Sequence, residues 1–281
     1  MLFKNMKTLT LRHDTTNKQE SCKIKPPAMN LRAFGDKLYV CDEGGHVMIY
    51  DHKLIVKGSY SDPKWDGVND VTVLPNFTVL PEKRLAVACK NGLFQVSDKD
   101  YLNEPLEKGE VYGSCVVVNK SLYACCNSHQ RIYEYRFENN KWRKVRRPHI
   151  YRQMSLQSRV KLAATANNTI IFGGTDPDTI YEMTLDGDSV VKHERKGAGA
   201  GELHLCAADA EGSILVADTK NNSLWVCEPS GAWTELDLRP PVTRPRSAVV
   251  INNKLCVASD NDNELDNGNE LFLYTPIIPV E

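Results

Sequence analysis

The residues with the strongest chemical character form a basic stretch, KWRKVRRPHIYRQ, at positions 141–153. It holds six lysine or arginine residues and no carboxylate, with Trp142, His149 and Tyr151 among them. Cationic side chains bind phosphates and carboxylates, and aromatic side chains stack on unpaired bases. The chain as a whole has no net positive charge to attract such ligands, because it contains 35 basic and 36 acidic residues. The stretch therefore predicts a local patch that binds RNA or an acidic protein.

The predicted patch excludes the first residues of this stretch. Lys141 and Arg143 alternate outward on an expected outer strand, where charge discourages pairing with another chain. The residues we assign to binding are Arg146, Arg147, His149, Tyr151 and Arg152, and the residues expected to extend the patch on neighbouring repeat units are Arg131, Arg159, Lys161, Arg244 and Arg246.

Motifs for catalysis or metal binding are mostly missing. The segment GAGAGE has Glu202 where a dinucleotide-binding loop needs its last glycine. The acidic insert SDNDNELDNGNE, at positions 259–270, has Leu265 and Leu271 where a calcium-binding loop needs Gly and Glu. We therefore expect no cofactor and no bound metal.

The nine cysteines lie mostly inside apolar runs and form no C-x-x-C pair. Such cysteines behave as small buried hydrophobic residues, so we predict free thiols and no structural zinc. The first residues lack the apolar segment of a secretory signal, and no apolar run is long enough to span a membrane. These features predict a cytoplasmic protein with reduced thiols and no membrane partner.

The elements that must position the binding residues recur along the chain. Six pairs of apolar strands start at intervals of 37 to 48 residues. Another apolar strand precedes each pair, and a more polar one follows most of them. Four antiparallel strands per unit, most apolar on the inside, are typical of propeller blades. We predict an all-β chain that forms a single domain, residues 1–281, folded as a six-bladed β-propeller with blades at about 28–60, 68–107, 110–150, 156–197, 198–239 and 240–281.

The two ends of the chain complete each other in this prediction. The sixth unit lacks an outer strand, and the amphipathic segment MKTLTLRH, at positions 6–13, has no unit of its own. Pairing the N-terminal strand with the last blade closes the ring and removes two exposed strand edges.

The fifth unit carries a family resemblance. Residues 195–233, RKGAGAGELHLCAADAEGSILVADTKNNSLWVCEPSGAW, resemble an NHL repeat. Gly212 fits a turn with positive φ, and Asp218, Asn221 and Asn222 can bond a turn backbone. The unit lacks the proline and the arginine usual in that repeat. The chain is thus similar to the C-terminal propellers of tripartite-motif ubiquitin ligases, which implies a non-enzymatic, target-reading module of the ubiquitin pathway that binds protein or RNA.

In a propeller with this strand order, the turns between second and third strands and the blade junctions share one face. We expect the partner there, with His46, His129 and His204 as surface residues rather than ligands. One enzymatic alternative stays open, a metal-dependent hydrolase like the lactonase-type propellers. Its channel metal would draw on Asn69 and Asp70, or on Asp209. The identity of the partner and the oligomeric state are left open.

Overall fold

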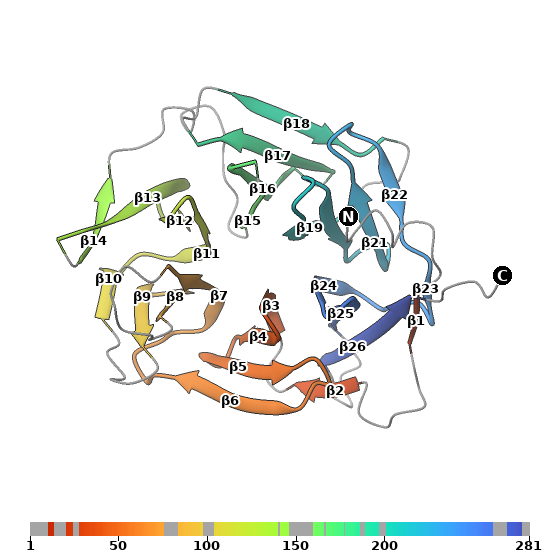
Figure 1. Cartoon of the computed structure of the whole chain (residues 1–281), viewed down its shortest axis with the longest axis horizontal. Helices are drawn as coiled ribbons and strands as arrows, with labels where there is room; N and C mark the ends of the chain where they lie inside the picture. The colour runs from red at the N-terminus through yellow and green to blue at the C-terminus, as the bar shows by residue number, and fades with distance from the viewer. Residues whose placement is uncertain are drawn as a thin grey trace.

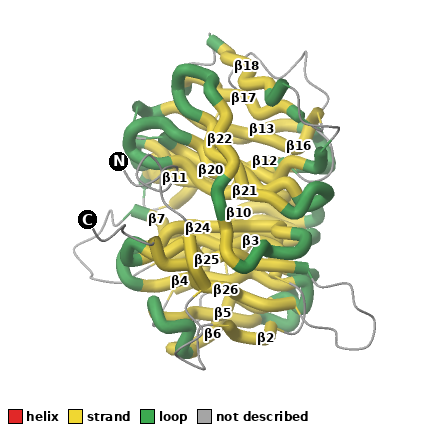
Figure 2. The backbone as a smooth tube through the Cα atoms, turned by 90° about the vertical axis from the view of Figure 1, so that its right-hand side faces the viewer, coloured by secondary structure: helices red, strands yellow, loops and turns green. Residues whose placement is uncertain are grey.

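The protein is a ring of β-sheets. The computed structural model describes residues 11–13, 21–24, 28–75, 84–97, 104–139, 141–145, 160–165, 167–176, 178–185, 189–196, 201–260 and 269–276. Their strands form six sheets arranged around one axis (Figure 1). Seen from the side, these residues consist of strands and loops alone (Figure 2). The prediction of an all-β, six-bladed propeller is confirmed.

Among the residues that the structure describes, no helix is long and apolar enough to cross a membrane.

Each of the first five blades is a four-stranded antiparallel sheet whose strands follow chain order from the axis outward. The first two blades are β3 (Ala28–Phe34), β4 (Lys37–Asp42), β5 (His46–Asp51), β6 (Val56–Ser61) and β7 (Val68–Leu74), β8 (Arg84–Cys89), β9 (Gly92–Ser97), β10 (Glu104–Lys108). The third and fourth are β11 (Tyr112–Val118), β12 (Ser121–Cys126), β13 (Arg131–Glu138), β14 (Lys141–Val145) and β15 (Lys161–Ala164), β16 (Thr169–Asp176), β17 (Thr179–Thr184), β18 (Val190–Glu194). The fifth is β19 (Leu203–Ala208), β20 (Ile214–Asp218), β21 (Ser223–Cys227) and β22 (Trp233–Glu235).

The sixth blade is built from both ends of the chain. Its inner strands are β24 (Pro245–Ile251), β25 (Lys254–Ser259) and β26 (Asn269–Pro276). Two N-terminal strands, β1 (Leu11–His13) and β2 (Ser21–Ile24), pair with successive parts of β26 in antiparallel register. A short strand, β23 (Leu238–Arg239), pairs with β1 in parallel. The predicted closure by the N-terminal strand is confirmed, although the first residues of the predicted segment, 6–10, lie outside the described residues.

The apolar core is divided among the blade interfaces. Six clusters of buried hydrophobic residues each join two consecutive blades, as Val116 and Phe172 do between the third and fourth. Each innermost strand also contacts the innermost strands of both neighbours. Inner strands are therefore covered on both faces, which is why they read as nearly continuous apolar runs.

Hairpin turns follow the residue types that their backbone requires. The β11–β12 turn, Asn119–Lys120, and the β24–β25 turn, Asn252–Asn253, have positive φ at both central residues, as type I′ turns do. Gly212, in the β19–β20 turn, has a φ of 86°, which confirms the predicted positive value.

The turns between second and third strands contact the blade junctions, so the two kinds of loop lie on one side of the ring. Asn127 N–H donates to Val111 O at 2.7 Å, Thr219 N–H to Glu202 O at 3.1 Å, and Asp260 N–H to Arg244 O at 3.1 Å. We call this side the loop face.

The outer strand of the second blade and the cysteines each reflect their local sequence. The outer strand of the second blade, β10, contains Pro105 and a register shift at Pro105/Glu107, which together hide its strand pattern. The described cysteines include eight buried free thiols, as expected from their apolar neighbours.

Candidate functional site at the ring axis

A buried ion pair joins the first two blades at the axis. The Arg32 guanidinium donates from Nε to Asp70 Oδ1 at 2.8 Å and from Nη2 to Oδ2 at 2.5 Å. The Arg32 side chain is 11% exposed, and that of Asp70 is fully buried. Burial acts to lower the pKa of Arg32, but the Asp70 carboxylate outweighs burial and raises that pKa above its usual value. The contact is therefore a charged, bidentate pair.

The same contact extends to the third and fourth blades. Asp70 also accepts hydrogen bonds from the Ser114 hydroxyl and from the Cys115 N–H, the latter at 3.1 Å. Arg32 Nη2 donates to the Leu162 carbonyl at 2.6 Å. The Leu162 N–H donates to Ser114 Oγ at 2.9 Å. One polar network thus connects four of the six blades.

Lys161 is the first residue of β15 and lies beside this network. Its ammonium group donates to the Arg246 carbonyl of the sixth blade at 3.0 Å. Among the described residues, Lys161 forms no ion pair with a carboxylate. Burial lowers the pKa of Lys161 to about 8. Cys206 and Asp70 oppose this shift, whereas the positive charges of Arg32 and Arg246 add to it.

Two arginines at the start of the sixth blade share one carboxylate. Arg246 forms an ion pair with Asp260, and Arg244 Nη2 lies 4.0 Å from the same oxygen. Lys161 contacts the main chain of Arg246, so three cations and one carboxylate lie along this part of the loop face. The axial site, as we use the term, consists of Arg32, Asp70, Lys161, Arg244, Arg246 and Asp260.

The structure brings together part of the predicted patch. Lys161, Arg244 and Arg246 meet at the axial site. Arg131 begins β13 in the third blade, and no hydrogen bond or ion pair among the described residues connects it to those three. The predicted residues Arg146, Arg147, His149, Tyr151, Arg152 and Arg159 lie outside the described residues.

Sequence reasoning misses Arg32 and gives Asp70 only the role of a potential metal ligand. Both are charged residues inside apolar inner-strand segments, LRAF and NDVTV. That pattern is the available signal, since a charge at a position covered on both faces needs a partner. The sequence does not say which two charges meet.

The three loop-face histidines all lie beside carboxylates. The nitrogen-to-oxygen distances are 3.1 Å for His46 and Asp42, 3.5 Å for His129 and Glu110, and 3.2 Å for His204 and Glu202.

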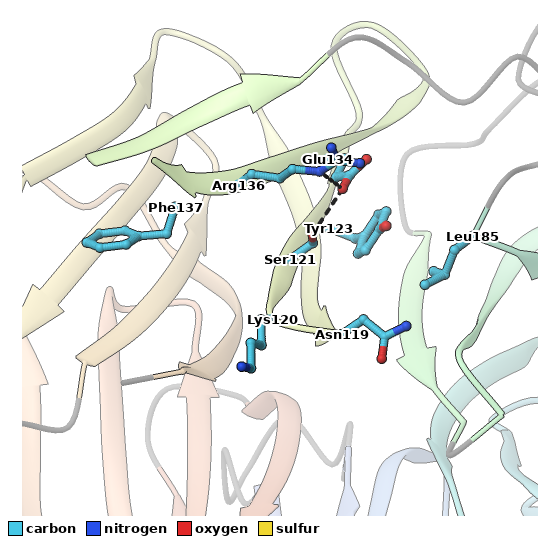
Figure 3. A pocket seen from close by; sticks show the side chains of 8 residues that line it. All are labelled: Asn119, Lys120, Ser121, Tyr123, Glu134, Arg136, Phe137 and Leu185. Atoms are coloured by element: carbon cyan, nitrogen blue, oxygen red, sulfur yellow. Dashed lines mark hydrogen bonds and ion pairs between the residues drawn. The ribbon is translucent and has the colours of Figure 1, made fainter. Parts of the chain in front are cut away.

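Away from the axis, described residues line two hollows. The larger, about 540 Å³, lies between the third and fourth blades, next to the β11–β12 turn and therefore opposite the loop face (Figure 3). Its acidic residue, Glu134, accepts hydrogen bonds from Arg136 at 2.6 Å and Ser121 at 2.9 Å. The smaller, about 380 Å³, lies beside β22 and is lined by Glu235 and Asp237. The larger hollow is also lined by Lys120 and Arg136, so its charges are mixed, whereas the charged residues of the smaller hollow are acidic.

Comparisons with known proteins identify the fold class. The chain is a six-bladed β-propeller. A scan against models of protein families finds no match, and neither does a search of curated protein sequences. Among solved structures it is similar to a catalytically inactive virginiamycin B lyase from Staphylococcus aureus, in complex with quinupristin. The two share 13% identity at a TM-score of 0.58, over 95% of this chain and 88% of the lyase.

Two further similar structures come from proteins of other kinds. An auxiliary nutrient binding protein from Bacteroides thetaiotaomicron is 12% identical at a TM-score of 0.62, over 96% of this chain and 76% of that one. A luciferin-regenerating enzyme is 12% identical at a TM-score of 0.62, over 91% of this chain and 94% of that one. At these identities the similarity establishes the fold alone.

Replacing Lys161 with methionine is expected to stabilise the protein at neutral pH. A folded-state pKa of about 8, below the ordinary 10.5, means that the unfolded chain binds more protons between these values. Wild-type stability should therefore rise as pH increases from about 8 to 10.5, and the methionine variant should lack that rise. Because Lys161 keeps partial solvent contact, we expect a gain of about 1–3 kcal/mol below pH 8, less than the full shift implies. Urea unfolding at several pH values measures it. A variant less stable than wild type at pH 7 would contradict the assignment.

Proposed function

We propose that the protein is a non-enzymatic interaction module whose loop face holds an acidic segment of a partner protein at the axial site. The observation that carries this proposal is Lys161, a largely buried cation whose one described hydrogen bond goes to a main-chain carbonyl. A carboxylate from a partner would give this charge the opposite charge that the described chain does not supply. Charge-assisted hydrogen bonds of this kind are about twice as strong as neutral ones.

The surrounding residues favour the same class of ligand. Arg246 lies next to Lys161, Arg244 lies beside the same Asp260 as Arg246, and Asp260 neutralises one of the three charges. An anion that docks here replaces water around cations already fixed by the ring, so little side-chain ordering is required. Specificity would come from the surrounding turns of the loop face.

The resemblance of the fifth blade to an NHL repeat extends the proposal to a pathway. On that resemblance we assign the protein to target recognition in a ubiquitin-ligase system. Asp218, the aspartate of that motif, accepts hydrogen bonds from Asn221 N–H at 3.1 Å and Asn221 Nδ2 at 2.7 Å. These bonds shape the β20–β21 turn of the loop face.

The metal-dependent hydrolase is less well supported by the contacts of its suggested ligands. Both Asp70 oxygens are bound by Arg32, whose positive charge would repel a cation. The Asn69 amide donates to Tyr112 O at 2.7 Å. Asp209 accepts from the N–H groups of Glu211 and Ser213 in a hairpin turn. These side chains are already used to hold the backbone and the ring.

A binding measurement tests the proposal. The probes are a fluorescent oligoglutamate peptide and a fluorescent single-stranded oligouridylate, each titrated with the intact chain at low and moderate salt. We expect salt-sensitive binding of the peptide, weakened about tenfold or more by Lys161→Met, which corresponds to about 1.4 kcal/mol. Affinity should also fall as the pH rises through about 8, because Lys161 loses its proton there.

Lys192→Met is the matched control, since Lys192 is an exposed lysine on the outer strand of the same blade. It should bind like wild type. Binding of the oligouridylate without the peptide would replace the acidic-protein proposal by RNA binding. Peptide binding that is unchanged in Lys161→Met would remove the axial site from the proposal.

A further inference from the structure

Three potential metal ligands meet on the loop face of the third blade, away from the axial site. Glu110 lies in the junction before β11, Cys126 ends β12, and His129 lies in the turn that follows. One ligand atom from each lies within 4.8 Å of the other two. Among the residues that the structure describes, this is the single group of three such side chains so close together.

Two distances from Glu110 are close to the edges of a metal-centred tetrahedron, although they end on different oxygens of its carboxylate. Cys126 Sγ lies 3.3 Å from Glu110 Oε2, and His129 Nδ1 lies 3.5 Å from Glu110 Oε1. Zinc bonds of about 2.3 Å to sulfur and 2.0–2.1 Å to nitrogen or oxygen put tetrahedral ligands about 3.3–3.5 Å apart. Rotation of the Glu110 carboxylate and of the half-exposed His129 side chain would bring the three ligand atoms around one ion.

Polar groups from three strands surround the cluster. The Tyr112 hydroxyl donates to Glu110 Oε2 at 3.0 Å, and the Tyr133 hydroxyl lies 2.9 Å from His129 Nδ1. Lys144 Nζ lies 3.9 Å from Glu110 Oε2, but it is nearer to Glu107, at 3.2 Å. The Glu110 carboxylate is thus oriented by a neighbouring hydroxyl, as metal-binding carboxylates are.

We propose that Glu110, Cys126 and His129 form a zinc site, with the fourth position open to water or to a ligand from a partner. The Cys126 side chain is buried, whereas that of His129 is 46% exposed, so the open position faces solvent. Binding converts the thiol to a thiolate and releases its proton to solvent, and no electrons are transferred. The ion would tie the β12–β13 turn to the junction before the third blade.

The hydrogen bond between Tyr133 and His129 gives this proposal a distinctive consequence. A metal on Nδ1 must displace the Tyr133 hydroxyl from that nitrogen. Tyr133→Phe should therefore bind zinc more tightly than wild type. A cluster that served only as a hydrogen-bonded brace would gain no metal affinity from losing this hydroxyl.

The experiment uses the intact chain, treated with a chelator and then dialysed, and titrates it with zinc chloride in a calorimeter. We expect one zinc ion per chain, with affinity at least about tenfold lower in Cys126→Ser and in His129→Gln. Cys89→Ser is the matched control, because Cys89 ends β8 as Cys126 ends β12 and is likewise buried. It should bind zinc like wild type.

Cobalt(II) provides a spectroscopic readout of metal binding to the Cys126 thiolate that does not depend on the stability of the fold. Cobalt(II) bound to a thiolate gives an intense sulfur-to-metal charge-transfer band in the near ultraviolet, which should appear in wild type and Tyr133→Phe and vanish in Cys126→Ser. Melting temperatures of the metal-free variants identify those that remain folded. Zinc binding of equal strength in folded Cys126→Ser, or no stoichiometric binding in wild type, would overturn the proposal.

Discussion

Replacing Arg32 with methionine is expected to lower the free energy of unfolding by about 3–5 kcal/mol. Methionine keeps most of the side-chain volume but leaves the fully buried Asp70 carboxylate without its bidentate partner. It also removes the hydrogen bond to the Leu162 carbonyl in the fourth blade. A loss of this size is a large fraction of the stability of a typical domain, which is about 5–15 kcal/mol. Urea unfolding measures this loss when wild type and variant show the same dependence of the unfolding free energy on urea concentration.

Two variants make this result specific. Arg32→Met combined with Asp70→Asn should recover part of the loss, because the uncompensated charge is then removed. Arg239→Met removes an arginine from an exposed pair with Asp237, whose side chains are 69% and 50% exposed, and should change stability by less than about 1 kcal/mol. If Arg32→Met proved no more damaging than Arg239→Met, the network would not hold the blades together.

Deleting residues 1–24 is expected to abolish cooperative unfolding. The deletion removes β1 and β2, which pair three and four residues, respectively, along the outer edge of β26. Ladder hydrogen bonds contribute about 0.5–1.5 kcal/mol each, so the loss amounts to several kcal/mol. The exposed edge of β26 would also be open to pairing with another chain. Deleting residues 1–14 removes β1 alone and should have a smaller effect.

Circular dichroism and size-exclusion chromatography would detect the loss of fold and the association of truncated chains. A synthetic peptide of residues 1–24, added in excess, should restore the folded monomer, because closure then becomes a binding reaction. A truncated chain that unfolds cooperatively at the same urea concentration as wild type would disprove the role of the N-terminal strands.

The axial site and the zinc site share the loop face but use different residues and different chemistry. Lys161 and its arginine neighbours attract anions, whereas Glu110, Cys126 and His129 attract a cation. A partner that engages both would combine a carboxylate at the axis with a metal ligand at the third blade. The tests are independent, since Lys161→Met should leave zinc affinity unchanged.

The regular spacing of apolar strands along the sequence was enough to predict the ring and its closure. Apolar pairs such as those of β12 and β13 recur at blade-length intervals, and an unpaired amphipathic segment at the N-terminus matches the unit that lacks an outer strand. Turn chemistry was equally local, because Gly212 and the Asn252–Asn253 pair adopt the positive φ that their residue types tolerate. The β10 strand escaped prediction because its proline and register shift interrupt the pattern.

The candidate sites needed the tertiary structure. Local sequence marked Lys161, Arg244 and Arg246 as cations. The contact of Lys161 with the Arg246 carbonyl, and of both arginines with Asp260, depends on how the inner strands of blades four and six face the axis. Arg32 finds Asp70 because consecutive inner strands touch, at a separation of 38 residues. Residue type and spacing therefore determined which backbone elements form, since hydrogen bonding and apolar patterning act along the chain. Closure of the ring decided which charges and ligand atoms meet, because those distances depend on how separate blades pack.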